Sequence, residues 1–241
     1  MIRLGLLETD ELYPDLVADY HSYGRMFERF FRAIDSAQDW EFRYYRVTRG
    51  ELPATLDECD AFLITGSKTG VYDEVDWLTP LTLWVQQAYA AHKPLIGICF
   101  GHQLLAHTLG GIAARSDRGW GIGVRSSQVM TQPEWSCHSA EQFRLIYSHR
   151  DQVEQLPARA TRLACCHFCP NAAFYIDNRV LAFQGHPEFT AEYTRRLLPR
   201  RQRCIGESRF QSGMATLTQP TDTRLVGQWM LDFLTNQTTR P

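Results

Sequence analysis

The feature that most constrains the fold is a short apolar segment, residues 94–98, that runs directly into a Gly-x-Cys-x-Gly motif centred on Cys99. The segment predicts a buried strand and the residues after it predict a helix, so the chain turns sharply at Cys99. Gly97 and Gly101 favour such a turn, because a Cβ at either position would crowd the neighbouring backbone. At the first turn of a helix, unpaired N–H groups and the helix dipole favour a thiolate, which is the form that attacks carbonyl carbon. We therefore predict a cysteine nucleophile, with an inert buried cysteine as the alternative.

A second apolar strand, residues 180–184, ends in the sequence His-Pro-Glu. His186 and Glu188 leave an extended chain on the same face, because side chains alternate along a strand. Glu188 is then placed to orient the imidazole of His186, which in turn takes the proton of Cys99. The alternative is that His186 caps the strand and Glu188 is solvated. The two strand-end motifs together favour a catalytic triad.

These motifs resemble those of the class I glutamine amidotransferases, which carry a Cys-His-Glu triad, and in particular the glutaminase domain of GMP synthase and its stand-alone relatives. The resemblance rests on Gly-Ile-Cys-Phe-Gly-His-Gln at residues 97–103 and Phe-Gln-Gly-His-Pro-Glu at residues 183–188. Segments 63–73 and 146–153 agree with the family pattern as well. The four ordered motifs extend the likeness over roughly residues 1–200.

The resemblance implies an oxyanion hole formed by backbone N–H groups of Gly66, Ser67 and Phe100. The first two belong to a glycine-containing loop, residues 65–70, that follows a buried strand. Many relatives have Gly-Gly-Pro where this chain has Gly-Ser-Lys, but backbone donors tolerate that change. A plain turn is the alternative, whereas a phosphate-binding loop is excluded because its second Gly-Lys-Ser/Thr is missing.

The resemblance also implies a substrate site. Gln103 lies one helical turn after the nucleophile, and a glutamine there contacts the amino-acid end of the substrate in this family. Tyr147, Ser148 and His149 end another strand, and the corresponding family segment grips the glutamine head group largely through its backbone. Arg150 replaces the more usual glycine, which leaves the local backbone conformation open, because arginine seldom adopts positive φ.

Short apolar segments alternate with helical patterns, which predicts an α/β fold with a mostly parallel sheet. The resemblance makes this an open, flavodoxin-like sheet with helices on both faces and some antiparallel strands in the second half. Strands are expected at 2–7, 41–47, 61–65, 94–98, 122–129, 143–148, 161–166, 173–177 and 180–184. Helices are expected at 23–34, from Cys99 to Gly110 and at 225–234. Another helix is expected to begin after an N-cap at Thr79, with Pro80 at the first helical position. A further helix is expected from Thr190 to about Leu198, where Pro199 ends it.

The chain of 241 residues is long enough for one large α/β domain, residues 1–241, with a polar segment at 200–221 before the closing helix. We expect that segment to be mobile or to face a partner, or else to be a solvated surface. The 25 basic and 27 acidic residues give a net charge of −2, so neither nucleic acid nor an anionic membrane is an expected partner. The first residues predict a strand and not a signal peptide, and no segment approaches a membrane span.

Seven cysteines and a proposed thiolate nucleophile favour a reducing compartment, and we expect the cytoplasm. The cluster Cys165, Cys166 and Cys169, close to His167, suggests zinc. A structural zinc site usually has four ligands in two paired half-sites, and Cys137-His138 is only a weak second pair. We therefore expect no metal and no other cofactor, and interpret the cluster as buried thiols on a strand and the turn that follows it.

The family chemistry is hydrolysis of the side-chain amide of glutamine through a γ-glutamyl thioester on Cys99, which gives glutamate and ammonia. Relatives pass the ammonia to a synthase, and this chain has no pyrophosphatase loop of its own, so a synthase subunit is a possible partner. A γ-glutamyl peptidase with the same triad is the first alternative. A non-catalytic, regulatory relative is the second, and the intact Cys99, His186 and Glu188 count against it.

Overall fold

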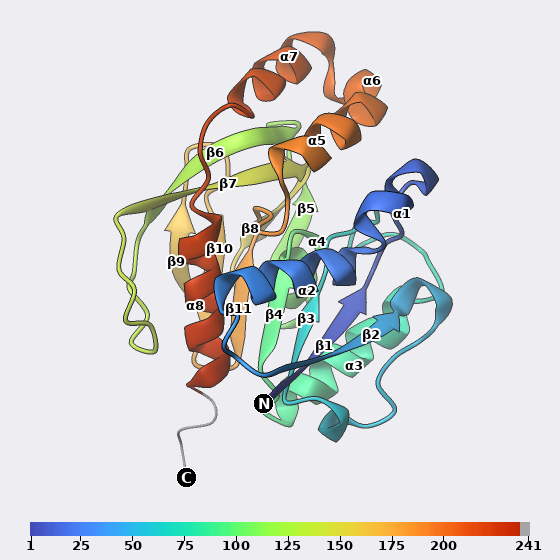
Figure 1. Cartoon of the computed structure of the whole chain (residues 1–241), viewed down its shortest axis with the longest axis vertical. Helices are drawn as coiled ribbons and strands as arrows, with labels where there is room; N and C mark the ends of the chain where they lie inside the picture. Colours follow the sequence, from blue (N-terminus) through green and yellow to red (C-terminus); the bar gives the residue numbers. More distant parts are fainter. Residues whose placement is uncertain (237–241) are drawn as a thin grey trace.

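A nine-stranded mixed sheet runs through the structure, which is a computed structural model and describes residues 1–236 (Figure 1). Its strand order is β2-β1-β3-β4-β11-β10-β9-β6-β7, and β5 and β8 form a separate pair. The strands are β1 (Ile2–Glu8), β2 (Trp40–Arg46), β3 (Ala61–Ile64), β4 (Leu95–Ile98), β5 (Ile112–Arg115), β6 (Gly121–Val129), β7 (Gln142–His149), β8 (Asp151–Gln155), β9 (Thr161–Cys165), β10 (Ala173–Ile176) and β11 (Val180–Phe183). Strands from β2 to β11 in this order are parallel, and those from β11 to β7 are antiparallel. The predicted fold class is confirmed.

Helices cover both faces of the sheet. They are α1 (Pro14–Tyr20), α2 (Tyr23–Ile34), α3 (Leu78–Ala90), α4 (Phe100–Thr108), α5 (Ala191–Leu197), α6 (Gln202–Ile205), α7 (Glu207–Thr216) and α8 (Thr223–Thr235), with short 3₁₀ segments at Val47–Arg49, Leu56–Glu58 and Leu198–Arg201. In Figure 1, α2 and α8 lie on the near face, and α3 and α4 lie behind the sheet. Within residues 1–236 no helix is long and apolar enough to cross a membrane.

Each face of the sheet has its own hydrophobic core. On one face, aromatic side chains of α2 and α8, such as Phe31 and Trp229, pack on strand residues. On the other face, Leu81 of α3 and Leu105 of α4 pack on the opposite sides of the same strands. The central strands are therefore buried on both faces, which explains why their sequences are continuous apolar runs.

The start of α3 differs from the prediction. The helix begins at Leu78 with Trp77 as its N-cap, so Thr79 is not the cap. Pro80 is the third helical residue instead of the first. A proline is tolerated there because the N–H groups of the first turn have no acceptor within the helix.

The polar segment 200–221 is folded and packs on the sheet, which differs from the expectation of a mobile segment. Thr190 caps α5 as predicted, but Pro199 does not end the helical path, which continues as the 3₁₀ segment Leu198–Arg201 and then as α6 and α7. Phe210 of α7 packs against Ile122 of β6 in a small separate core. This helical segment rises above the ends of β6 and β7 (Figure 1) and contributes to the site described next.

Candidate active site

Cys99 occupies the sharp turn between β4 and α4, with φ 54° and ψ −98°. A positive φ is strained for a residue with a side chain, and such strain is typical of functional turns. A Cβ added to Gly97 would lie 2.5 Å from the carbonyl oxygen of Gly101, and one added to Gly101 would lie 2.3 Å from that of Ile64. Both clashes are with backbone, so the prediction that only glycine fits at these two positions is confirmed.

His186 and Glu188 follow directly after β11. Nδ1 of His186 is 2.8 Å from Oε1 of Glu188, and both side chains are almost completely buried. The backbone N–H of His186 donates to the carbonyl of Ile146 at 2.8 Å, which ties this turn to β7. The ring of Phe189 lies parallel to the imidazole. The base is therefore held through its backbone, its Nδ1 and one face of its ring.

The strand order brings the nucleophile to the base. Strands β4 and β11 are parallel neighbours, and the N–H of Cys99 donates to the carbonyl of Phe183 at 2.9 Å. The Cys99 thiol lies close enough to the imidazole of His186 to influence its pKa, and since Nδ1 faces Glu188, Nε2 is the nitrogen available to sulfur. Burial lowers the pKa of His186, but the charges of Glu188 and Cys99 outweigh it and raise that pKa to about 10. The imidazole is thus protonated at neutral pH, the state that stabilises a neighbouring thiolate.

Gly66 lies directly beside the triad. A Cβ at this position would be 2.9 Å from Cε1 of His186 and 3.5 Å from Cβ of Cys99. The hydroxyl of Thr9, just past the end of β1, donates to the carbonyls of Thr65 at 3.0 Å and Gly66 at 3.2 Å. These bonds fix the carbonyls of the turn, so its backbone approaches the nucleophile in a defined orientation.

The other two predicted oxyanion donors also lie near the nucleophile. Phe100 is the first residue of α4, so the helix supplies no acceptor for its N–H. Ser67 lines the cavity in front of Cys99, and its hydroxyl accepts from the N–H of Thr69 at 3.1 Å. The structure therefore brings the predicted backbone donors to one place.

A cavity of about 290 Å³ lies in front of Cys99. Predicted site residues that line it are Ser67, Cys99, Gln103, Ser148 and His149. Its other charged lining residues are Lys68, Asp73, Arg115, Arg150, Asp151 and Arg201. The two carboxylates are engaged, because Asp73 accepts from the N–H of Gly70 at 2.8 Å and Asp151 from the hydroxyl of Tyr72 at 2.7 Å. Both carboxylates keep their charge, and Lys68 is paired with Asp10 at 2.9 Å. Arg115, Arg150 and Arg201 therefore give the cavity only a small positive balance.

Gln103 and His149 both attach to the start of β8. Nε2 of Gln103 donates to the carbonyl of Asp151 at 2.8 Å and to Oε1 of Gln184 at 3.1 Å. Nδ1 of His149 is 2.9 Å from the same carbonyl, and because a carbonyl only accepts, Nδ1 carries the proton. Burial lowers the pKa of His149 to about 3, so its ring is neutral. Its Nε2 is then a buried acceptor with no hydrogen-bond partner in residues 1–236.

The residues on either side of Ser148 and His149, which are Tyr147 and Arg150, are placed differently from each other. Tyr147 is fully buried, its hydroxyl lies 3.0 Å from that of Ser127, and it does not line the cavity. The structure therefore does not bring this predicted binding side chain to the site. Arg150 lines the cavity and needs no glycine-like backbone, since the described non-glycine residues with positive φ are His21, His92, Cys99 and Asp177.

Comparison with known proteins identifies the family. Residues 19–202 match the family model for the class-I glutamine amidotransferases, and this range includes Cys99 and His186. The chain belongs to the class-I glutamine amidotransferase family. The resemblance deduced from the motifs, and the class of enzyme that it implied, are confirmed.

Similar proteins include both kinds of relative expected from the sequence. Gamma-glutamyl peptidase 2 of Arabidopsis thaliana is 30% identical over 193 residues, which cover 78% of this chain and 77% of the relative. A GMP synthase of Dehalococcoides mccartyi is 30% identical over 128 residues, which cover 53% of this chain and 23% of the relative. The crystal structure of a glutamine amidotransferase from Thermotoga maritima superposes on this chain with a TM-score of 0.76 at 22% identity. The match covers 100% of this chain and 99% of the other, which shows that the two share a fold.

Arg201 is a cavity residue that the motifs gave no reason to expect. Arg201 lies at the end of the 3₁₀ segment Leu198–Arg201, and its guanidinium donates to the hydroxyl of Ser148 at 2.9 Å and to the carbonyl of Ser148 at 3.3 Å. It thereby ties the helical segment to the end of β7. In the sequence it is one of several neighbouring arginines, and only the path of the backbone singles it out.

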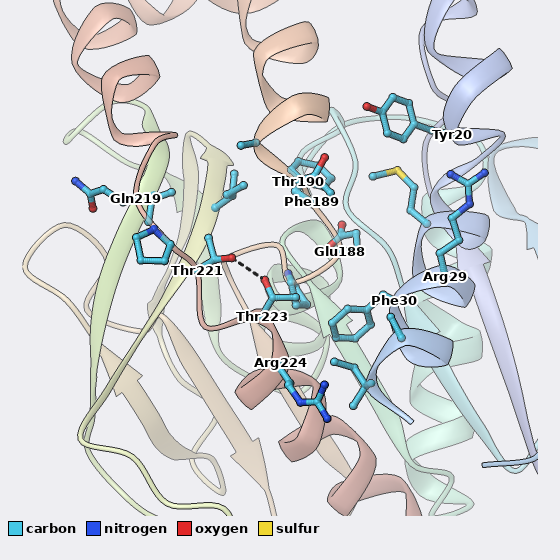
Figure 2. A pocket seen from close by; sticks show the side chains of 18 residues that line it. Tyr20, Arg29, Phe30, Glu188, Phe189, Thr190, Gln219, Thr221, Thr223 and Arg224 are labelled. Atoms are coloured by element: carbon cyan, nitrogen blue, oxygen red, sulfur yellow. Dashed lines mark hydrogen bonds between the residues drawn. The ribbon is translucent and has the colours of Figure 1, made fainter. Parts of the chain in front are cut away.

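A larger cavity of about 700 Å³ is lined in part by Glu188, and Cys99 is not among its lining residues. Figure 2 shows the Glu188 carboxylate among the side chains that line it, near Phe189 and Thr190. Oε2 of Glu188 is buried without a hydrogen-bond partner in residues 1–236. The triad carboxylate of this amidotransferase therefore faces a second, mainly apolar cavity.

All seven cysteines of the amidotransferase are free thiols. Cys169 is buried, and burial raises the pKa of its thiol, but Cys165 and Cys166 are only half-buried. The expectation of buried thiols is thus correct for Cys169 alone. Within residues 1–236, three metal-binding side chains converge in one place only, at Cys137, His138 and Asp232.

Proposed function

We propose that this amidotransferase hydrolyses the side-chain amide of glutamine to glutamate and ammonia through a thioester on Cys99. One observation carries the proposal. The strained turn at Cys99 presents its thiol to the imidazole of His186, whose other nitrogen is paired with Glu188 at 2.8 Å. This is the arrangement of nucleophile, base and orienting group that acyl transfer requires.

The reaction proceeds in two halves. Sulfur of Cys99 attacks the amide carbon, and His186 protonates the departing nitrogen, which leaves as ammonia. A water molecule then attacks the γ-glutamyl thioester, with His186 as the base, and glutamate is released. Glu188 keeps the imidazole in the orientation and tautomer that both halves need. Neither half requires a metal or an organic cofactor.

The backbone around Cys99 supports the charge that develops. The N–H groups of Gly66, Ser67 and Phe100 are the donors to the oxyanion, and one such donor typically contributes about 3 kcal/mol to transition-state stabilisation. Gln103 and the segment of Ser148 and His149 hold the amino-acid end of the substrate.

The ammonia has two possible fates in this proposal. A synthase subunit would accept it, as the name of the GMP synthase relative suggests, or it would be released to solvent. A free thiol nucleophile is best preserved in a reducing compartment, for which we propose the cytoplasm.

A second candidate function is cleavage of γ-glutamyl peptides by the same triad. Its support is the positive cavity, in which Nε of Arg150 is buried without a hydrogen-bond partner in residues 1–236. A peptide attached to the γ-carbonyl carries a carboxylate that arginine binds well, whereas the leaving group of glutamine is only ammonia. Similarity to Gamma-glutamyl peptidase 2 of Arabidopsis thaliana points to the same substrates.

The test is release of ammonia, glutamate and amines by the purified chain from glutamine and from a series of γ-glutamyl dipeptides. Cys99→Ala is the inactive variant, and Cys165→Ala, whose thiol lies outside the cavity, is its matched control. Cleavage that requires Cys99 but not Cys165 supports the mechanism. Equal activity of Cys99→Ala and the wild type on a cleaved substrate would overturn it.

The substrate profile separates the two functions. Cysteine-dependent cleavage of dipeptides well above that of glutamine favours the peptidase. Slow hydrolysis of glutamine with no cleavage of dipeptides favours a glutaminase that serves a synthase subunit. In either case, acid quenching during turnover should trap the wild-type chain with the added mass of a γ-glutamyl group on Cys99.

A further inference from the structure

Three side chains outside the active site converge on one point at the surface. Sγ of Cys137 is 3.5 Å from Nδ1 of His138 and 3.9 Å from Oδ2 of Asp232, and Nδ1 of His138 is 2.9 Å from that same oxygen. Cys137 and His138 belong to the loop that joins β6 to β7, and Asp232 belongs to α8. Thiol, imidazole and carboxylate are the three ligand types that zinc binds most often in proteins.

The pattern of contacts differs from that of a second catalytic triad. In a triad the imidazole uses one nitrogen for the nucleophile and the other for the carboxylate. Here the sulfur and the carboxylate oxygen both approach Nδ1 of His138. Three donor atoms that face one another across a single point are arranged for a shared cation and not for relayed proton transfer.

The distances suit a tetrahedral ion. With zinc–ligand bonds of roughly 2.0–2.3 Å, the donor atoms of a tetrahedral site lie about 3.3–3.6 Å apart. The two sulfur distances of 3.5 and 3.9 Å are close to this range. The nitrogen–oxygen pair at 2.9 Å has the spacing of a hydrogen bond, and a small outward rotation of either side chain admits the ion.

The loop that carries two of the ligands is fastened to the helix that carries the third. Trp229 and Asp232 lie on one face of α8, at i and i+3, and Asn236 is the C-cap of the helix. Nε1 of Trp229 donates to the carbonyl of His138 at 2.6 Å, and Nδ2 of Asn236 donates to the carbonyl of Trp135 at 3.3 Å. The backbone of the loop is therefore held against α8 before any ion binds, which lowers the entropic cost of binding.

The surroundings also orient the carboxylate. The hydroxyl of Ser136 donates to Oδ2 of Asp232 at 2.8 Å. Metal-binding carboxylates commonly accept such a bond from a neighbouring group, which fixes their direction. His138 and Asp232 are only partly exposed, whereas Cys137 is at the surface, so the site opens to solvent on one side.

We propose that Cys137, His138 and Asp232 bind Zn²⁺, with a water molecule as the fourth ligand. The ion would join the β6–β7 loop to α8, which lie beside each other in Figure 1. Asp232 lies about 13 Å along α8 from Thr223, which lines the larger cavity next to Glu188, so the site is separate from the triad. The zinc site stabilises the fold and takes no part in the proposed hydrolysis.

The test is a zinc titration in which Cys99→Ala serves as the parent protein, because Cys99 and His186 offer a second thiol and imidazole. Zinc affinity is measured by competition with a chromophoric chelator, with a phosphine reductant present. We expect one tight zinc ion per chain and a loss of affinity of at least about 100-fold in Cys137→Ser, since loss of even an outer partner of a ligand costs about 10- to 100-fold. Cys204→Ser, which removes the other exposed thiol, is the matched control and should bind as the parent does.

Two further measurements identify the ligands. Co²⁺ bound in place of zinc should give a sulfur-to-cobalt charge-transfer band that disappears in Cys137→Ser and persists in Cys204→Ser. Zinc should raise the melting temperature of the parent and of Cys204→Ser, but not of Cys137→Ser or Asp232→Asn. Melting curves without metal show whether each variant is folded. Equal zinc affinity in Cys137→Ser and the parent, or no stoichiometric binding by a folded parent, would overturn the proposal.

Discussion

The imidazole of His186 lies flat against the ring of Phe189, with ring centroids 3.8 Å apart and ring planes 9° from parallel. Glu188 fixes the direction in which the imidazole points through Nδ1, and Phe189 fixes the plane in which it lies. Phe189 directly follows the triad carboxylate in the sequence, so the same short segment provides His186 and both of the side chains that orient it. Phe189 is a positioning residue in the proposed mechanism.

Replacement of Phe189 by leucine should lower kcat with little change in KM. Leucine keeps most of the apolar volume but cannot hold the imidazole plane, and aromatic stacking contributes about 0.5–1.5 kcal/mol, which corresponds to a loss of up to about tenfold. Phe189→Tyr is the control, because it keeps the flat ring and its hydroxyl has room in the larger cavity. Steady-state kinetics of the three proteins test the role, and equal kcat for leucine and phenylalanine would argue against it.

Replacement of Glu188 by glutamine should move the alkaline limit of activity to lower pH. The carboxylate charge helps to hold the pKa of His186 near 10, and loss of a neighbouring opposite charge typically shifts a pKa by about 1–3 units. The profile of kcat/KM against pH should therefore fall off earlier in this variant. Glu192→Gln, which removes a carboxylate from the first turn of α5, should keep the wild-type profile.

The protonated imidazole should also make stability depend on pH. The pKa of His186 is raised from about 6.5 in the unfolded chain to about 10 in the folded protein. Its stabilising contribution is therefore complete below pH 6.5 and is lost as the pH rises through 10. Urea unfolding between these pH values should show a smaller loss of stability in His186→Gln than in the wild type. A parallel decline in both proteins would contradict the shift.

Replacement of Gly101 by alanine should destabilise the protein, although alanine normally favours helices over glycine by about 1 kcal/mol. The added Cβ would lie 2.3 Å from the backbone carbonyl of Ile64, and overpacking typically costs about 1–3 kcal/mol. Gly213→Ala in α7 is the comparison, because there the added Cβ would meet side-chain atoms, Cδ1 and Cγ1 of Ile122 at 2.4 Å, instead of backbone. Free energies of unfolding should rank Gly101→Ala as the less stable variant.

Replacement of Arg201 by methionine should raise KM more than it lowers kcat. Arg201 holds the hydroxyl and the carbonyl of Ser148, next to the amino-acid end of the proposed substrate. Loss of hydrogen bonds from a charged donor costs about 1.5–3 kcal/mol, so KM should increase at least about tenfold. Arg203→Met, on the exposed face of the following helix, should leave both constants unchanged.

The triad could be predicted from the sequence because each of its parts is local. Cys99 follows β4 directly and His186 lies three residues after the end of β11, and parallel strands deliver such residues to the same edge of the sheet. The family resemblance then supplied the substrate and the residues of the oxyanion hole and the substrate site. The pairing of β4 with β11 itself could not be derived from residue patterns, since it joins segments far apart in the chain.

The helical segment above the cavity was missed for a different reason. Its many arginines suggested a solvated stretch, yet Ile205, Phe210, Met214 and Leu217 recur at intervals close to helical periodicity and are partly or fully buried. That signal was present in the sequence. The contact of Arg201 with Ser148 carried no such signal, because it depends on how the chain folds back after α5.

The strands β5 and β8 were also not predicted, and the side chain of Tyr147 faces the core, whereas the contact expected of its segment is largely through the backbone. Both strands are short, and charged residues interrupt their apolar pattern. For Tyr147, a strand that is buried along most of its length shows no polar face in its sequence, so the inward and outward positions cannot be told apart by composition.

The adjacency of β4 and β11 bears on the chain while it is being synthesised. Six strands, β5 to β10, are translated after the strand that precedes Cys99 and before the strand that precedes His186. A nascent chain that has emerged only as far as residue 150 holds its nucleophile but lacks its base and the carboxylate that orients it. Hydrolytic activity of the proposed kind thus cannot begin until β11 has entered the sheet, so the reaction itself reports that the last strand is in place.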